Sequence, residues 1–350
     1  MFRFKSEFLT DFVKVITMKV KLNINLKTEP MRNTKIILTA MAAAALVTFT
    51  SCNKDDNSGT SDGTMLVKLT DAPVDDANIK ATYVTVSQVK IDGKAVESFS
   101  PQTIEISAYT KGNARLLLSE QMAASAHQNI SLVLNYAQDA DGNTPGCYVL
   151  TKDDTKHTLS SSADATGEIM LNKNFEINSS SETNLVVDFD LRKSIQHGNS
   201  TAAESDYSFV SQTELNSAFR VVEEDSTGSV QGTTDGSLSN SDEVVVYAYQ
   251  KGTYNESTET TAQGSNNLRF THAVTSAKVA SDGSYKLAFL ESGDYEIHLA
   301  SYSENSNTGE MEFNGTVTAN SNISGLLLNN ITVEANAQVS LDISLKSILP

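Results

Sequence analysis

Short runs in which apolar and polar residues alternate dominate the chain from Met65 onward. The segment "NLVVDFDLRK" places four apolar side chains on one face of an extended strand: Leu185, Val187, Phe189 and Leu191. Its other face carries Asp188 and Asp190, and "ISLVLNY" follows the same pattern from Ile130 to Tyr136. Because successive side chains of a strand point to opposite faces of a sheet, this period predicts an all-β protein.

Two local features qualify this pattern. In "YVTVSQVKIDGK" the apolar phase changes between Val86 and Val89, so we expect a β-bulge near Ser87–Gln88, followed by an Asp92–Gly93 turn. The segment "NARLLLSEQM", residues 113–122, has helical character. We therefore expect one short helix there.

A hairpin is predicted near the C-terminal end of the chain. Its first strand places Tyr285, Leu287 and Phe289 on one face, and a turn follows at residues 291–294. Its second strand presents Tyr295, Ile297 and Leu299 to the same core. His298, beside Glu296, is then expected to face solvent.

Composition limits the kinds of partner and of metal site. The net charge is −17, and residues 1–51 hold eight basic and three acidic side chains, so the remainder carries −22. A body with this charge repels phosphate backbones, so we expect no nucleic-acid partner. The chain has two cysteines, Cys52 and Cys147, which excludes a disulfide framework and a zinc site built from three or four cysteines. Cys147 is expected to be a small packed residue.

The N-terminal region has the features of an export signal. From Met31 the chain has a basic start, an apolar stretch and small residues before Cys52, so residues 31–51 are predicted to be a signal peptide. Residues 1–30 match no export signal, and we interpret them as an upstream extension outside the true start. Residues 52–63 are expected to form a polar, flexible tether.

The residues around Cys52 resemble two short bacterial signals. The stretch Phe49-Thr50-Ser51-Cys52 resembles a lipoprotein cleavage box, which implies that Cys52 is acylated and anchors the protein in a membrane. Lys54, Asp55 and Asp56 resemble the signal that sends lipoproteins of Bacteroidetes-type bacteria to the exterior of the outer membrane. A merely solvated tether is the alternative for these three residues.

Two β-sandwich domains in series are predicted after the tether, at residues 64–215 and 228–350. The segment "LTDAPVDD", the strand "NIKATYVTVSQVKI" and "ARLLL" resemble an uncharacterised domain family of bacterial lipoproteins, over about residues 63–195. That resemblance implies a β-sandwich and no biochemical activity. The later segments "GSVQGTT", "SDGSY" and "SGDY" are similar to transthyretin-like, carboxypeptidase-regulatory-like modules, which are seven-stranded sandwiches.

No catalytic or cofactor-binding constellation is evident in the sequence. Asp139, Asp141 and Asn143 have the spacing of calcium ligands, but Thr144 and Leu150 replace the glycine and glutamate of a calcium loop, so they are weak metal candidates. The histidines are scattered without metal spacing, and no phosphate or dinucleotide motif is present. We therefore expect a protein that is not an enzyme and has no cofactor.

The sequence favours a cell-surface lipoprotein of the outer membrane that acts as a non-enzymatic binding or adhesion module. The alternative is a carbohydrate-binding accessory of a nutrient-uptake system. The absence of Trp counts against that alternative, and the 11 Tyr leave it open. The partners expected are the membrane, through the lipid, and an unknown protein or glycan ligand.

Overall fold

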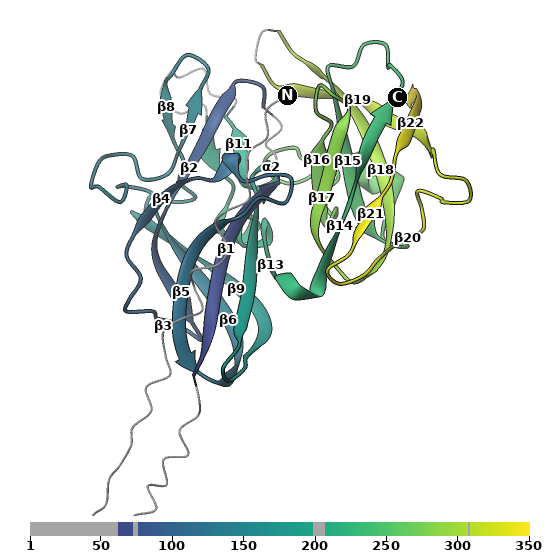
Figure 1. The fold of residues 1–350 in the computed structure, drawn as a ribbon. Helices are drawn as coiled ribbons and strands as arrows, with labels where there is room; N and C mark the ends of the chain where they lie inside the picture. The colour runs from purple at the N-terminus through teal and green to yellow at the C-terminus, as the bar shows by residue number, and fades with distance from the viewer. Residues whose placement is uncertain (1–61, 73–75, 199–206, 307–308) are drawn as a thin grey trace, which may run out of the picture. The chain divides into compact units, whose positions relative to one another are not determined.

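The computed structural model describes residues 62–72, 76–198, 207–306 and 309–350, and Figure 1 shows their arrangement. The described residues belong to one compact unit. The predicted signal peptide, Cys52 and Lys54, Asp55 and Asp56 lie outside the described residues. Strands make up most of the described chain, which confirms the all-β class.

Two facing sheets form the first sandwich. One sheet has the order β13-β10-β1-β5, in which β1 and β10 are parallel, with bounds Phe219–Glu223, Glu182–Asp190, Asp62–Ala72 and Arg115–Ala123. The other has the order β8-β7-β2-β6-β9, with bounds Lys156–Thr158, Tyr148–Thr151, Ile79–Ile91, Ser125–Asn135 and Thr166–Ile177. β3 (Lys94–Ala95) and β4 (Gln102–Glu105) also pair with β2.

Short elements connect these strands. They are the 3-10 turns η1 (Ile106–Ala108) and η2 (Glu224–Ser226), the helices α2 (Leu191–Ser194) and α3 (Gln212–Ser217), and the paired strands β11 (Ile195–His197) and β12 (Tyr207–Phe209). A capping box between Ser211 and Glu214 begins α3. β13 follows α3 and lies within the segment that was expected to bridge the two domains.

The core of the first sandwich follows the predicted phase. The apolar residues Leu185, Val187 and Phe189 are buried, as are Ile130, Leu132, Leu134 and Tyr136. The register between β2 and β6 shifts between Val86 and Gln88, which confirms the predicted bulge. Asp92 and Gly93 both have positive φ in the turn that follows.

The predicted helix over residues 113–122 is wrong. This segment is the edge strand β5, antiparallel to β1, with a register shift between Val67 and Lys68. Its leucines are good helix formers, but pairing with β1 buries Leu117 and Leu118 in the sandwich. Tertiary pairing therefore overrides local propensity.

A single sheet, folded over on itself, forms the second sandwich. Its order is β16-β15-β18-β19-β22-β14-β17, with bounds Thr275–Lys278, Glu243–Gln250, Gly293–Glu304, Met311–Ser321, Ile343–Leu349, Thr227–Asp235 and Ser284–Glu291. β20 (Ile331–Val333) pairs with β18, and β21 (Gln338–Ser340) pairs with β14. One core cluster contains residues of β14, β15, β17 and β18.

The predicted hairpin is β17–β18, and one of its core assignments is wrong. Tyr285, Leu287, Tyr295, Ile297 and Leu299 are buried together as expected. Phe289 is instead only partly buried, and its place in the core is taken by Leu290. The cause is a bulge in β17, where Leu287 pairs with Val230 but Leu290 pairs with Gly228.

The second face of β15 and β18 is covered by residues 254–273, which include α4 (Glu256–Glu259). Tyr247 stacks on Phe270 with ring centroids 4.3 Å apart, and its hydroxyl lies 2.7 Å from that of Tyr302. The Tyr249 hydroxyl donates to Glu259. This aromatic layer positions the segment that contacts the first sandwich.

Candidate functional site at the junction of the two sandwiches

A group of charged residues lies where β10 ends and α2 begins. Asp188 and Asp190 occupy the face of β10 opposite the core residues, yet both are buried. Asp190 caps α2 by accepting a hydrogen bond from the Lys193 backbone amide, and its carbonyl accepts one from the Ser194 hydroxyl. The short helix therefore presents Arg192 and Lys193 beside two carboxylates.

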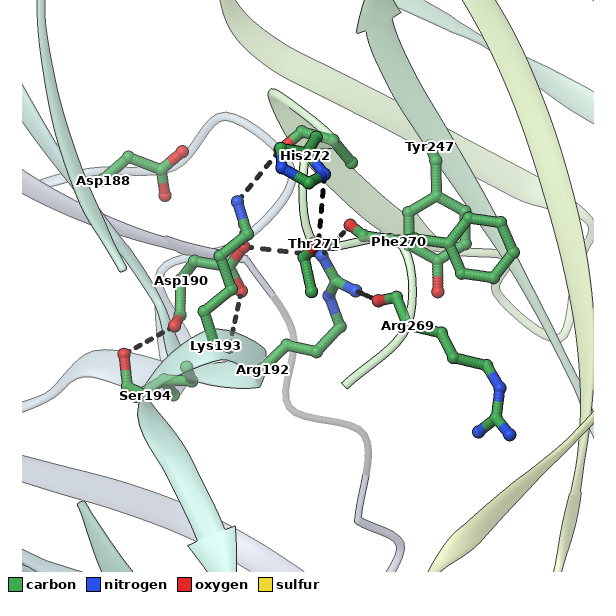
Figure 2. A network of polar contacts seen from close by, with 12 residues as sticks. Asp188, Asp190, Arg192, Lys193, Ser194, Tyr247, Arg269, Phe270, Thr271 and His272 are labelled. Carbon is green, nitrogen blue, oxygen red and sulfur yellow. Dashed lines mark hydrogen bonds and ion pairs between the residues drawn. The ribbon is translucent and has the colours of Figure 1, made fainter. Parts of the chain in front are cut away.

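Figure 2 shows these cations beside the loop 269–273 of the second sandwich. The Arg192 guanidinium donates to the carbonyl oxygens of Arg269 at 2.8 Å and of Phe270 at 3.3 Å. Lys193 Nζ donates to the Ala273 carbonyl at 3.0 Å and lies 3.4 Å from Asp190 Oδ2. Arg192 also lies over the Tyr247 ring, 5.0 Å from its centroid. The second sandwich thus supplies main-chain acceptors and an aromatic face to cations of the first.

A third cation makes a similar contact from β13. Arg220 Nε donates to Asp188 Oδ2 at 2.9 Å, while its terminal nitrogens donate to the carbonyls of Phe289 at 2.6 Å and Ala288 at 3.4 Å. These two carbonyls belong to the bulge of β17, where the strand ladder is interrupted. The bulge that displaces Phe289 from the core therefore gives Arg220 its acceptors.

Both arginines donate to a phenylalanine in the left-handed region. Phe270 has φ +57° and Phe289 has φ +54°. This conformation costs a non-glycine residue roughly 1–2 kcal/mol, and it persists where surrounding contacts over-determine it. The guanidinium contacts of Arg192 and Arg220 supply such contacts at these two positions.

Burial sets the electrostatics of the junction. Desolvation raises the pKa of Asp71 well above its usual value, although Asp71 Oδ1 accepts a hydrogen bond from the Leu191 amide. Desolvation also raises the pKa of Asp188, against the opposing effect of Arg220. Burial lowers the pKa of Lys193, and Asp190 opposes that shift. The junction therefore favours a partly neutralised set of charges over fully ionised groups.

A polar cleft of about 620 Å³ adjoins this junction. Its walls come from both sandwiches and include Asp76, Arg192, Gln196, His197 and Tyr207 from the first, and Asn266, Asn267, Arg269, Glu310, Glu312 and Phe313 from the second. Arg269 donates from Nε to the Thr260 carbonyl, and its guanidinium lies 5.0 Å from the Phe313 ring centroid. Among the described residues, no hydrogen bond from its two terminal nitrogens is found, so both can donate to a ligand in the cleft.

A second hollow, of about 760 Å³, lies beside β18 and β19. It is lined in part by His298, which was expected to face solvent. His298 is not an ordinary solvated residue, because its ring stacks on Tyr254 with centroids 3.5 Å apart. Desolvation lowers the pKa of His298 and raises that of Tyr254 to about 12. This hollow is lined by apolar residues of the loop 323–328 together with polar residues of β19, whereas the cleft between the sandwiches contains charged and amide groups.

The other residues singled out in the sequence, Asp139, Asp141, Asn143 and Cys147, make loop hydrogen bonds or pack in the core. Asp139 accepts hydrogen bonds from the amides of Asp141 and Asn143 and from the Asn143 side chain, so its oxygens close the loop between β6 and β7. Within the described ranges, no cluster of three or more His, Cys, Asp or Glu could hold a metal ion. Cys147 is buried, as expected, and desolvation raises its pKa to about 12.

Sequence reasoning missed Arg192, Lys193, Arg220 and Arg269. The motif "DFDLRK" did contain a signal, because its acidic face continues directly into two cations beside a strand with a fully apolar opposite face. Asp188 and Asp190 are buried although they lie on the face of β10 opposite the core, so a second part of the protein covers that face. The partners of these cations are main-chain carbonyls, which no side-chain pattern reveals.

Comparison with known protein families identifies one domain in the chain. The family model described as "Domain of unknown function (DUF4382)" matches residues 62–209, so a DUF4382 domain is present over the first sandwich. This agrees with the predicted resemblance to an uncharacterised domain. No curated protein matches the chain.

Several solved structures resemble parts of the fold at low similarity. A leucine-rich repeat protein from Bacteroides thetaiotaomicron is 12% identical with a TM-score of 0.21, and the match covers 83% of this chain but 27% of that protein. The minor pilin GBS52 of Streptococcus agalactiae is 12% identical with a TM-score of 0.19, covering 82% and 97% of the two chains. The fimbrial anchor protein Mfa2 of Porphyromonas gingivalis is 13% identical with a TM-score of 0.17, covering 80% and 90%.

The helices in the described ranges are all short. None is long and apolar enough to cross a membrane.

Proposed function

We propose that this chain is a lipid-anchored, surface-displayed binding or adhesion module that holds its ligand in the cleft between its two sandwiches. The observation that carries this proposal is the cleft itself, whose walls come from both sandwiches. Ligand sites occur preferentially at the interfaces between domains, where a few polar groups converge in a concave surface. The guanidinium of Arg269, held by Thr260 and Phe313, is one such group.

The junction supports this role because it fixes the two walls of the cleft. Arg192 contributes to the junction and to the cleft, and it donates to the carbonyls of Arg269 and Phe270. A ligand therefore meets walls that are already held in place, which reduces the ordering cost of binding.

An array of glycans and surface proteins, probed with the full chain, tests the proposal. We expect a ligand whose binding is lost in Arg269→Ala and kept in Lys346→Ala, because Lys346 is exposed on β22 and does not line the cleft. Thermal melting checks that both variants are folded. A ligand that binds both variants equally would place the site elsewhere, and a chain that binds nothing on the array would remove the basis for the proposal.

Anchoring is tested separately. Replacing Cys52 with Ala should release the chain from membranes into the soluble fraction, since the acyl group is the predicted anchor. Replacing Lys54, Asp55 and Asp56 with Ala should leave lipidation intact but protect the chain from protease added to whole cells. Unchanged surface cleavage would reduce these three residues to linker.

The alternative of carbohydrate capture gains no specific support from the tyrosines. Tyr83 and Tyr148 stack with ring centroids 4.7 Å apart, and Lys156 lies over the Tyr148 ring. Stacked in this way, the rings cover each other and do not form a coplanar platform for a sugar. The array nevertheless distinguishes a glycan from a protein ligand.

A further inference from the structure

The sheet of the second sandwich divides between β18 and β19. The two strands pair from Glu304 and Met311 as far as Ala300 and Thr316, where their ladder ends. β19 continues to Ser321 and remains paired with β22, whereas the first residues of β18 pair with β20. Among the described residues, the edge of β19 that faces β18 therefore has no strand partner after Thr316.

The hollow of about 760 Å³ beside β18 and β19 lies at this division, and we call it the β18–β19 groove. It is lined by residues 297–299 of β18, by residues 316–321 of β19 and by the loop 323–329. Its volume is within the range of about 300–1,000 Å³ that is usual for ligand pockets. No described residue lines both this groove and the cleft between the sandwiches. The groove is therefore a separate candidate site.

Exposed apolar side chains gather at the groove. Five large apolar residues are exposed in the described ranges, and Ile323, Leu327 and Leu349 are three of them. All three line the groove, where Leu327 is 62% exposed and Leu349 is 49% exposed. Contiguous apolar side chains on a protein surface mark an interaction site. The groove therefore offers apolar contacts that the described parts of the chain leave uncovered.

Charge is nearly absent from the groove, although the whole chain has a net charge of −17. Residues 313–333 contain no Asp, Glu, Lys, Arg or His. His298 lines the groove, but its ring stacks on Tyr254 and desolvation lowers its pKa, so the ring is neutral at pH 7. An occupant that is itself mainly uncharged therefore enters the groove without losing the hydration of ions.

One carboxylate lies where the free edge begins. Glu256 is exposed and lines the groove, and its Oε1 accepts a hydrogen bond from the Thr316 hydroxyl at 3.4 Å. No Lys or Arg is present among the described lining residues. Charge complementarity therefore favours an occupant with a basic group at the end that lies beside Glu256.

We propose that the β18–β19 groove binds an extended peptide segment of another protein, which adds to the free edge of β19 as a strand. A strand edge presents a row of amides and carbonyls, and another extended chain pairs with them along its length. Alternate apolar side chains of the segment pack on Leu327 and Leu349, and a basic residue at one end pairs with Glu256. A second copy that offered the same edge brings no basic group from residues 313–333 to Glu256.

A peptide array probed with the full chain tests this site. Its peptides have about six residues, enough to span the free edge at roughly 3.4 Å per residue. Val, Ile or Leu alternates with Thr, and one end carries Lys, Gln or Glu. We expect the tightest binding with Lys and the weakest with Glu. N-methylation of alternate amides removes main-chain donors and keeps the side chains, so it should abolish binding, and equal binding of the methylated peptides would rule out an added strand.

Variants of the chain locate the site. Leu349→Ser should weaken binding of the Lys peptide about tenfold, as expected when a leucine that becomes buried is removed. Leu116→Ser is the matched control and should bind like the wild type, because Leu116 is also 49% exposed but lies on β5 of the first sandwich. Glu256→Gln should weaken binding of the Lys peptide roughly two- to fivefold, the size of an exposed ion pair. Thermal melting checks that the variants are folded.

Absence of binding across the array, or equal binding by the wild type and Leu349→Ser, would overturn the proposal. Sedimentation of the chain without peptide tests the second copy as occupant. A dimer that forms in the wild type and is lost in Leu349→Ser would assign the groove to self-association and contradict the peptide. None of these measurements involves Arg269 or the cleft, so this proposal and the proposed function fail separately.

Discussion

At the scale of single residues, the junction consists of cationic side chains that donate hydrogen bonds mainly to main-chain carbonyl oxygens. Arg192 lies beside the buried Asp190 of its own sandwich, and Arg220 beside the buried Asp188. Each arginine also donates to two main-chain carbonyls of the other sandwich. Main-chain acceptors do not depend on the identity of the side chain at the residue that supplies them. The carboxylates that balance the cations, Asp188 and Asp190, are side-chain groups and are lost when the residue is replaced.

Asp71 is a residue whose ionisation is opposed by burial in the fold. Its folded pKa is raised by burial, so its contribution to stability is present below the ordinary value of 3.8 and is lost as the pH rises through the folded value. Asp71→Asn keeps an oxygen for the Leu191 amide and removes the charge. We expect this variant to lose less stability between pH 4 and 8 than the wild type does in urea unfolding. A parallel pH dependence in the two proteins would contradict the assignment.

At the scale of elements, the alternating pattern was sufficient for strands with one continuous phase. β6 and β10 follow it fully, and the phase change in β2 predicted its bulge correctly. β5 was missed because its three leucines suit a helix equally well until β1 is beside them. Phe289 was misplaced because the bulge in β17 serves Arg220, a partner distant in sequence.

The phase of β18 is tested by Tyr295→Asp. Tyr295 is buried beside Ile297 and Leu299, and its hydroxyl donates to the Glu291 carbonyl. An unpaired carboxylate there should cost several kcal/mol, a large part of the roughly 5–15 kcal/mol that stabilises a domain. We expect loss of the cooperative thermal transition of the second sandwich. Lys346→Asp, at an exposed position of β22 in the same sandwich, is the control and should melt close to the wild type.

At the scale of the whole molecule, the sequence indicated two sandwiches but not the joint between them. Alternation identifies a covered face only when that face is apolar, and the second face of β10 carries Asp188 and Asp190. The cleft was missed for a different reason: its walls are loops and strand ends from distant parts of the chain.

Arg220→Met tests whether the junction couples the sandwiches. Removing Arg220 takes away the nearest cation of the buried Asp188 carboxylate, and because the Arg220 side chain is partly exposed the expected cost is about 1–3 kcal/mol. Unfolding in urea, followed by circular dichroism, measures the loss. Adding Asp188→Leu should restore part of the stability, because the buried charge is then removed. If Arg220→Met alone were as stable as the wild type, the Arg220–Asp188 pair would add nothing to the stability of the junction.

The central claim, a surface-anchored module that binds through its cleft, is tested most directly by ligand capture on whole cells. Cells carrying the wild-type chain, Cys52→Ala, Arg269→Ala or Lys346→Ala are incubated with the labelled ligand from the array and counted by flow cytometry. The account predicts capture by the wild type and by Lys346→Ala, and none by the other two, with the Cys52→Ala chain found unanchored but able to bind. Equal capture by Arg269→Ala cells, or capture that persists when Cys52 is replaced, would contradict it.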